Sequence, residues 1–155
     1  MLRKGDKAPD FFLKNQDDIE IGLRDFGSKT IILYFYPKDN TSACTLEAQD
    51  FSNLSPLFEE MDSIIVGISP DSPKSHKGFI TNKQLNIILL SDSQRQVMSA
   101  YGTYGSKIMY GKEVRGVIRS TFIIRDGIVL ESFYNVRAKG HAHYILETLK
   151  KINSC

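Results

Sequence analysis

Residues 34–51 read YFYPKDNTSACTLEAQDF, a stretch that joins the end of an apolar run to the start of a helical pattern. The run, residues 30–36, is continuous and rich in β-branched and aromatic side chains, which is typical of a strand buried on both faces. Pro37 ends the run, and apolar residues at helical spacing then predict a helix that begins near Ser42. One of the two cysteines of the chain, Cys44, therefore falls in the first turn of a helix that follows a buried strand.

The remaining sequence continues this alternation of strands and helices. Asp126 and Gly127 supply the turn of the clearest hairpin, and Ser72 followed by Pro73 is a typical helix start. The predicted strands and hairpins are 11–23, 63–69, 86–90 and 116–136, and the further predicted helices are 73–83, 93–102 with Asp92 as cap, and 141–152. This order indicates one α/β domain over residues 1–155, with a central mixed β-sheet flanked by helices and an N-terminal β-hairpin.

Composition and charge exclude several classes of protein. The 155 residues carry twenty basic and eighteen acidic side chains, a formal net charge of +2, with the signs interspersed. This pattern predicts no nucleic-acid partner and no anionic membrane surface, and no apolar run approaches the ~20 residues of a membrane span. The two cysteines form neither a CxxC pair nor a zinc-binding spacing with histidine, which indicates a reducing compartment without a metal site. We therefore expect a cytoplasmic protein.

The position of Cys44 is consistent with a reactive thiol. A helix N-terminus presents unpaired backbone N–H groups and the positive end of the helix dipole, and both stabilise a thiolate. Cysteines at such positions can have a pKa lowered from about 8.5 to roughly 3.5–7.5. Asn40, Thr41 and Ser42 are candidate caps for this helix. A lone cysteine is also often only a small buried apolar residue, so its position alone leaves both interpretations open.

The residues around Cys44 carry a family resemblance. Pro37, Thr41 and Cys44 form the pattern PxxxTxxC, Glu47 follows three residues later, and a distant strand segment, RSTFII, begins with Arg119. Together with GDKAPDF near the start and VGISPDS after the second core strand, these motifs closely resemble the peroxiredoxin family, and most of all its bacterioferritin comigratory protein branch, also called the Q type. The resemblance runs over nearly the whole chain. It implies a thioredoxin-like fold and a thiol peroxidase that needs no haem, flavin or metal.

The resemblance also implies roles for the residues that would contact the peroxide. Cys44 is the expected peroxidatic nucleophile, and Thr41 is expected to hydrogen-bond the substrate through its hydroxyl. Backbone N–H groups around Ala43 and Cys44 are expected to donate to the peroxide oxygens. Arg119 would hold positive charge beside the thiolate at every accessible pH. An arginine is usually exposed, so this role requires that Arg119 points inward.

Three further residues are expected to support the pocket. By resemblance, Pro37 shields the sulfur from water and Glu47 orients the arginine, while Tyr36, next to Pro37, could reach the pocket. Each also has a purely structural interpretation, because Pro37 ends the strand, Glu47 favours the helix dipole and Tyr36 fits a core position. Thr41 could likewise serve only as a helix cap.

A sulfenic acid must be reduced, commonly by a second, resolving cysteine. Many Q-type members carry it five residues after the first, which is Gln49 here, and others carry it in the next helix, the region FITNKQ (79–84) here. Both usual positions lack cysteine, which favours a one-cysteine mechanism. The expected reductant is thioredoxin or a low-molecular-weight thiol, and Cys155 remains a possible resolving residue.

The expected substrates are hydrogen peroxide and small organic hydroperoxides, and the expected assembly is a monomer or weak homodimer. Two other functions remain open, a peroxide sensor or redox relay, and a non-catalytic thioredoxin-like binding module. Among the other polar candidates, His141 and His143 are expected on different faces of a helix. His76 is expected alone on a surface helix, and Tyr101, Tyr104 and Tyr110 of the Gly-rich region 101–113 are expected to line a mobile loop near the site or an interface.

Overall fold

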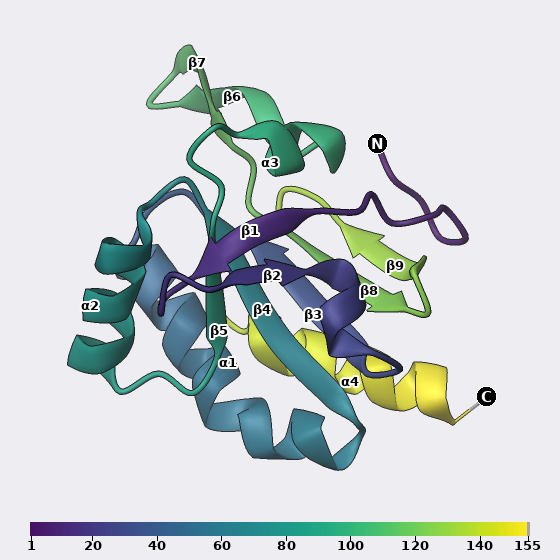
Figure 1. Cartoon of the computed structure of the whole chain (residues 1–155). Helices are drawn as coiled ribbons and strands as arrows, with labels where there is room; N and C mark the ends of the chain where they lie inside the picture. Colours follow the sequence, from purple (N-terminus) through teal and green to yellow (C-terminus); the bar gives the residue numbers. More distant parts are fainter. Residues whose placement is uncertain (155) are drawn as a thin grey trace.

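The computed structural model describes residues 1–154 and places most of its strands in one mixed sheet (Figure 1). These strands are β1 (Phe12–Asn15), β2 (Glu20–Gly22), β3 (Thr30–Phe35), β4 (Ser63–Ser69), β5 (Ile88–Ser91), β8 (Ser120–Arg125) and β9 (Ile128–Phe133). Their order across the sheet is β2-β1-β5-β4-β3-β8-β9. The central strands β3, β4 and β5 are parallel, and the outer strands are antiparallel to them or to each other.

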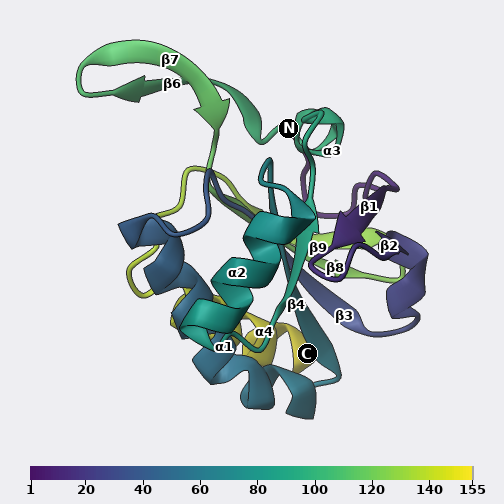
Figure 2. The ribbon, with the colours of Figure 1, turned by 60° about the vertical axis from the view of Figure 1, so that its left-hand side comes forward.

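Helices cover this sheet unequally on its two faces. The helices are α1 (Ser42–Glu60), α2 (Pro73–Lys83), α3 (Gln96–Ala100) and α4 (His141–Asn153), with a 3-10 turn η1 (Leu23–Phe26). Figure 2 shows α1, α2 and α4 together on one side of the sheet. Successive residues of a strand face opposite sides, so Tyr34 of β3 joins the core under these helices, whereas Leu33 joins a second core that contains Phe11 and Met98.

The predicted elements around Cys44 are confirmed. Every residue of β3 is buried, and α1 begins at Ser42. In the pairing of β3 with β8, Phe35 lies opposite Ser120. This register places residue 119, which directly precedes β8, beside the end of β3 from which the chain leads to α1.

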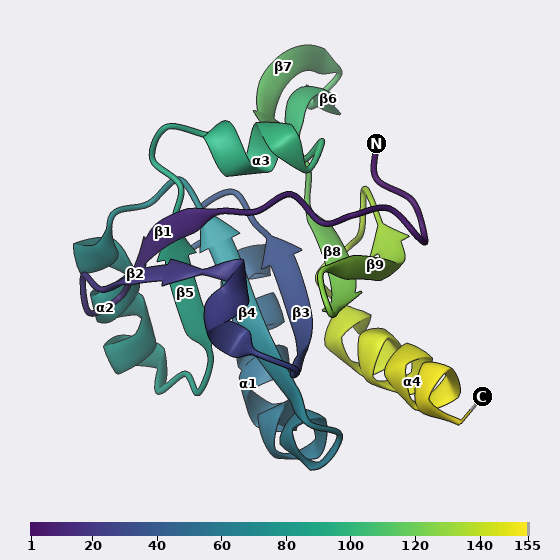
Figure 3. The same ribbon diagram turned by 45° about the vertical axis from the view of Figure 1, so that its right-hand side comes forward.

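The prediction of a loop at residues 101–113 is wrong, because most of this region forms a separate hairpin. Its strands are β6 (Tyr104–Met109) and β7 (Lys112–Val117), which extend away from the rest of the molecule (Figure 3). Tyr110 and Gly111 make the turn with φ angles of 53° and 77°, the positive values that a tight two-residue hairpin turn requires. Tyr101 lies in the core and is fully buried.

Two boundaries differ from the predictions in an instructive way. The strand predicted at 86–90 lies at 88–91, and the helix predicted from residue 93 begins at Gln96. Arg95 rather than Asp92 is the residue before the first helical position, but the carboxylate of Asp92 still accepts the N–H groups of Val97 and Met98 in the first turn. Among the described residues, no helix combines the length and the apolar composition needed to cross a membrane.

Candidate active site

Cys44 lies in the first turn of α1, where the chain has just left the sheet through residues 37–41. The N–H of Thr45 donates to the carbonyl of Thr41, so the N–H groups of Ala43 and Cys44 precede the hydrogen-bond ladder of the helix. The cysteine itself is 1% exposed. The sulfur is therefore almost enclosed. It lies at the positive end of the helix dipole, which is the position that the sequence predicted.

Arg119 points inward and contacts this sulfur. Its Nη2 donates to Sγ of Cys44 at 3.2 Å, and its Nη1 donates to Oε1 of Glu47. The residue lies in the link between β7 and β8 rather than on a strand, and its carbonyl accepts the N–H of Val136. Burial alone would lower the pKa of Arg119, but Glu47 and Cys44 outweigh this effect and raise the pKa above its ordinary value. The guanidinium therefore stays charged beside the sulfur.

Glu47 is the buried partner of this arginine, one turn along α1 from the cysteine. Its side chain has no exposed surface, and Oε2 has no hydrogen-bond partner among the described residues. Burial raises the pKa of Glu47 to about 7, although the charge of Arg119 lowers it. A carboxylate held this far from water is costly unless it is paired, so the contact with Arg119 is its main compensation.

Thr41 is the residue before the first helical position, but its side chain does not cap the helix. The hydroxyl instead donates to the carbonyl of Lys38 at 2.9 Å. The side chain is exposed, and the hydroxyl oxygen retains lone pairs that can accept a hydrogen bond from a ligand. The side chain of Thr41 therefore does not cap the helix, and its role toward a peroxide stays a prediction.

Pro37 and Tyr36, two of the residues expected to support the pocket, differ in burial. Pro37 is half-buried directly after β3, and its shielding role stays a prediction. Tyr36 is 1% exposed and its hydroxyl donates to Oδ1 of Asp39 at 2.6 Å. The expectation that Tyr36 reaches toward the peroxide pocket is therefore not met, because its polar group is bound to Asp39.

His76 is fully buried, so the prediction that it stands alone on a surface helix is wrong. Its ring lies 2.8 Å from Oδ2 of Asp39 and 3.0 Å from the carbonyl of Leu90. Asp39, Asp71 and His76 have potential metal-ligand atoms that all lie within 4.8 Å of one another. These atoms already hydrogen-bond to one another or to neighbouring groups, so the cluster is satisfied by the chain itself.

Two residues near Arg119 were not singled out as members of this site from the sequence. Lys107 of β6 donates to the carbonyl of Val117 at 2.8 Å and interacts electrostatically with Arg119 and Cys44. His141, at the start of α4, is buried against Thr121, and burial followed by the charge of Arg119 lowers its pKa to about 4. His143 is exposed, so the prediction of different faces for this pair is confirmed. Only the hairpin and the packing of α4 reveal these neighbours.

Comparison with known proteins agrees with this geometry. The model of the AhpC/TSA family matches residues 4–132. The chain belongs to this family. A putative peroxiredoxin bcp of Helicobacter pylori is 53% identical over 149 residues, which are 96% of this chain and 98% of the relative. Peroxiredoxin Bcp of Bacillus subtilis is 39% identical over 150 residues and 96% of each chain.

Solved structures of bacterioferritin comigratory protein and PrxQ have the same fold as this chain. Xanthomonas campestris bacterioferritin comigratory protein, studied for its alkyl peroxide reduction activity, superposes with a TM-score of 0.86 at 35% identity, over 91% of this chain and 90% of its own. A cysteine-to-serine mutant of Xylella fastidiosa PrxQ reaches 0.92 at 32% identity, over 99% and 98%. The thioredoxin-like fold and the activity class, a peroxiredoxin with thiol peroxidase function, are thus confirmed. Cys155, the possible resolving residue of this peroxiredoxin, lies outside the described residues.

Proposed function

We propose that this peroxiredoxin reduces hydrogen peroxide and organic hydroperoxides through a sulfenic acid on Cys44. The observation that carries the proposal is the contact of Arg119 with the sulfur at 3.2 Å, in the first turn of a helix. A fixed cation and helix N–H groups both favour the thiolate, which is the nucleophilic form. The alkyl peroxide activity named for the Xanthomonas campestris relative supports organic hydroperoxides as substrates.

The geometry supports a direct displacement. The Cys44 thiolate attacks the terminal oxygen of the hydroperoxide, the S–O bond forms and the O–O bond breaks with its electron pair on the leaving oxygen. Sulfur is oxidised to sulfenic acid, and the alkoxide or hydroxide that leaves takes a proton from water. Thr41 accepts the O–H of the peroxide, since its own proton is donated to Lys38. Arg119 and the free N–H groups at the start of α1 stabilise the charge that develops.

The first test is the second-order rate of Cys44 oxidation by hydrogen peroxide, measured by competition against a peroxidase of known rate. The variant Cys155→Ser isolates the site. We expect a rate orders of magnitude above that of a free thiolate, because the donors are already in place. A rate equal to that of a free thiolate would favour a non-catalytic binding module instead.

The chemistry after oxidation is proposed to be of the one-cysteine type. Residue 49 is glutamine and the region 79–84 contains no cysteine, so an external thiol, thioredoxin or a small thiol, is expected to attack the sulfenic acid. We place this cycle in the cytoplasm, with the protein as a monomer or weak homodimer. A peroxide relay would differ by passing the oxidation to a partner protein with low turnover.

Intact mass after one equivalent of peroxide tests the one-cysteine proposal. We expect the mass of one added oxygen, because neither usual resolving position can supply an intramolecular thiol. The variant Cys155→Ser is the matched control and should give the same product. A monomer that has lost two hydrogens, or a disulfide-linked dimer, would show instead that Cys155 resolves Cys44.

A further inference from the structure

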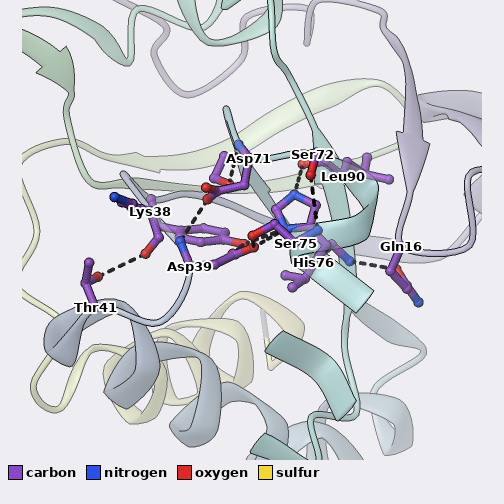
Figure 4. A network of polar contacts seen from close by, with 12 residues as sticks. Gln16, Lys38, Asp39, Thr41, Asp71, Ser72, Ser75, His76 and Leu90 are labelled. Carbon is purple, nitrogen blue, oxygen red and sulfur yellow. Dashed lines mark hydrogen bonds and ion pairs between the residues drawn. The ribbon is translucent and has the colours of Figure 1, made fainter. Parts of the chain in front are cut away.

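A buried network lies beside the segment 37–41 that leads to Cys44 (Figure 4). At its centre, the carboxylate of Asp39 accepts the hydroxyl of Tyr36 at 2.6 Å and the hydroxyl of Ser75 at 2.8 Å, and lies 2.8 Å from Nδ1 of His76. The side chains of Asp39 and His76 are 1% and 0% exposed. The reaction outlined above uses none of these groups, so their burial needs another explanation.

The hydrogen-bond directions show that His76 and Asp39 form an ion pair. A carbonyl can only accept, so Nε2 of His76 must donate to Leu90. Nδ1 faces a carboxylate oxygen and must donate as well, which makes the ring an imidazolium. Burial would raise the pKa of Asp39, but the hydrogen bond and the charge of His76 outweigh it and lower the pKa below its ordinary value.

The network reaches Thr41 through a single peptide group. The N–H of Asp39 donates to Oδ2 of Asp71 at 2.8 Å, and the carbonyl of the same peptide, which belongs to Lys38, accepts the hydroxyl of Thr41 at 2.9 Å. A trans peptide is planar, with its N–H and C=O pointing in opposite directions. Asp71 therefore fixes the direction of the carbonyl that orients Thr41.

The N–H of this peptide and the side chain of Asp39 are both held by residues at or just before the start of α2. Ser69 donates to the same oxygen of Asp71 at 2.7 Å and holds it in place. His76 and Ser75, both on α2, hold the side chain of Asp39. The peptide can turn only if it breaks a bond to Asp71 or pulls a buried charge away from His76, and separating a buried ion pair is costly.

We propose that Asp71 and His76 are positioning residues of the peroxide reaction, which hold the Lys38–Asp39 peptide so that the hydroxyl of Thr41 presents its lone pairs to the peroxide. This inference rests on the proposed roles of Cys44 and Thr41. Near-attack geometry accounts for a large part of many catalytic rates. A hydroxyl that rotates freely would be oriented correctly for only part of the time.

The test is a double-mutant cycle on the rate of Cys44 oxidation by hydrogen peroxide, in the Cys155→Ser background. Asp71→Ala and His76→Gln are each measured alone and combined with Thr41→Val. We expect each single variant to lower the rate by about tenfold to a hundredfold, because a misplacement of 1 Å can cost up to about a hundredfold. With Thr41→Val present, neither substitution should lower the rate further, because the hydroxyl that they orient is gone.

The control is His143→Gln, which changes an exposed histidine on α4 and should leave the rate unchanged. The inference would be overturned if Asp71→Ala or His76→Gln lowered the rate by the same factor with Thr41→Val present as without it. Such independence would mean a merely structural role, which does not depend on the hydroxyl. A wild-type rate no faster than a free thiolate would instead overturn the proposed function.

Nitrogen NMR of the histidine rings gives a second measurement that needs no variant. We expect a proton on each ring nitrogen of His76, because both nitrogens face acceptors. A neutral ring would remove the ion pair from the argument and overturn the inference, even if His76→Gln failed to fold.

Discussion

Replacement of Arg119 by methionine should lower the rate of Cys44 oxidation by about a thousandfold, roughly 4 kcal/mol of transition-state stabilisation. Arginine contributes here in two ways, because its Nη2 donates to the sulfur and its charge is proposed to stabilise the oxygen that leaves. Methionine keeps much of the volume of the side chain and removes both contributions. The measurement is the competition rate with hydrogen peroxide in the Cys155→Ser background.

Two variants make this result specific. Arg119→Lys keeps the charge, but one ammonium cannot reproduce the fork that binds Cys44 and Glu47 at the same time, so it should recover only part of the rate. Arg125→Met removes an arginine at the opposite end of β8, where it contacts Thr30 and Asn153, and should leave the rate unchanged. A loss below threefold for Arg119→Met would mean that the contact with the sulfur has no catalytic consequence.

Local patterns in the sequence predict most of the scaffold. Residues 31–36 show no alternation of polar and apolar side chains, and this predicts the fully buried β3 because only a central strand needs apolar side chains on both faces. Ser72 with Pro73 predicts the start of α2 because the cap and the fixed φ of proline both act within one turn. Such signals are visible because cause and effect lie within a few residues.

The missed features depend on contacts between residues that are distant in the sequence. His76 has an ordinary position in a helix, and only its partners on the segment before α1 and on β5 show why it is buried. Lys107 belongs to a hairpin, but the glycine-rich sequence of this region predicted a loop. Gly116 leaves room for this lysine, since a β-carbon there would lie 3.0 Å from its Cε. Neither contact has a signal in the local pattern.

Arg119 illustrates both sides of this division. Its role was expected from a family motif, yet its inward direction could not be read from the residues beside it. The structure explains the direction, because residue 119 lies beyond the first pair of the β3–β8 ladder and its backbone is held by Val136. Glu47, which accepts a hydrogen bond from Arg119, is 72 residues away along the chain.

Replacement of Glu47 by glutamine should change how stability depends on pH. The folded protein binds a proton at Glu47 up to a pKa of about 7, whereas the unfolded chain releases it near the ordinary pKa of 4.5. Between these values the unfolded state binds fewer protons, so the free energy of unfolding falls as pH rises, by about 1.4 kcal/mol per pH unit. Over this pH range the free energy of unfolding of the wild type should therefore fall by about 3 kcal/mol, whereas that of Glu47→Gln should not show this fall.

Urea unfolding of the two proteins from pH 4 to 8 measures this difference directly. At low pH the curves should nearly coincide, because protonated glutamate and glutamine are both neutral and similar in shape. At high pH the glutamine variant should be the more stable protein. Its amide oxygen can still accept from Arg119, so most of the oxidation rate should remain.

Glu60→Gln, an exposed change on the same helix, is the control, and its stability should depend on pH as that of wild type does. Parallel curves for Glu47→Gln would contradict the high pKa and would mean that water reaches the unpaired oxygen. A divergence would show that the protein keeps, at neutral pH, a carboxylate whose burial costs stability.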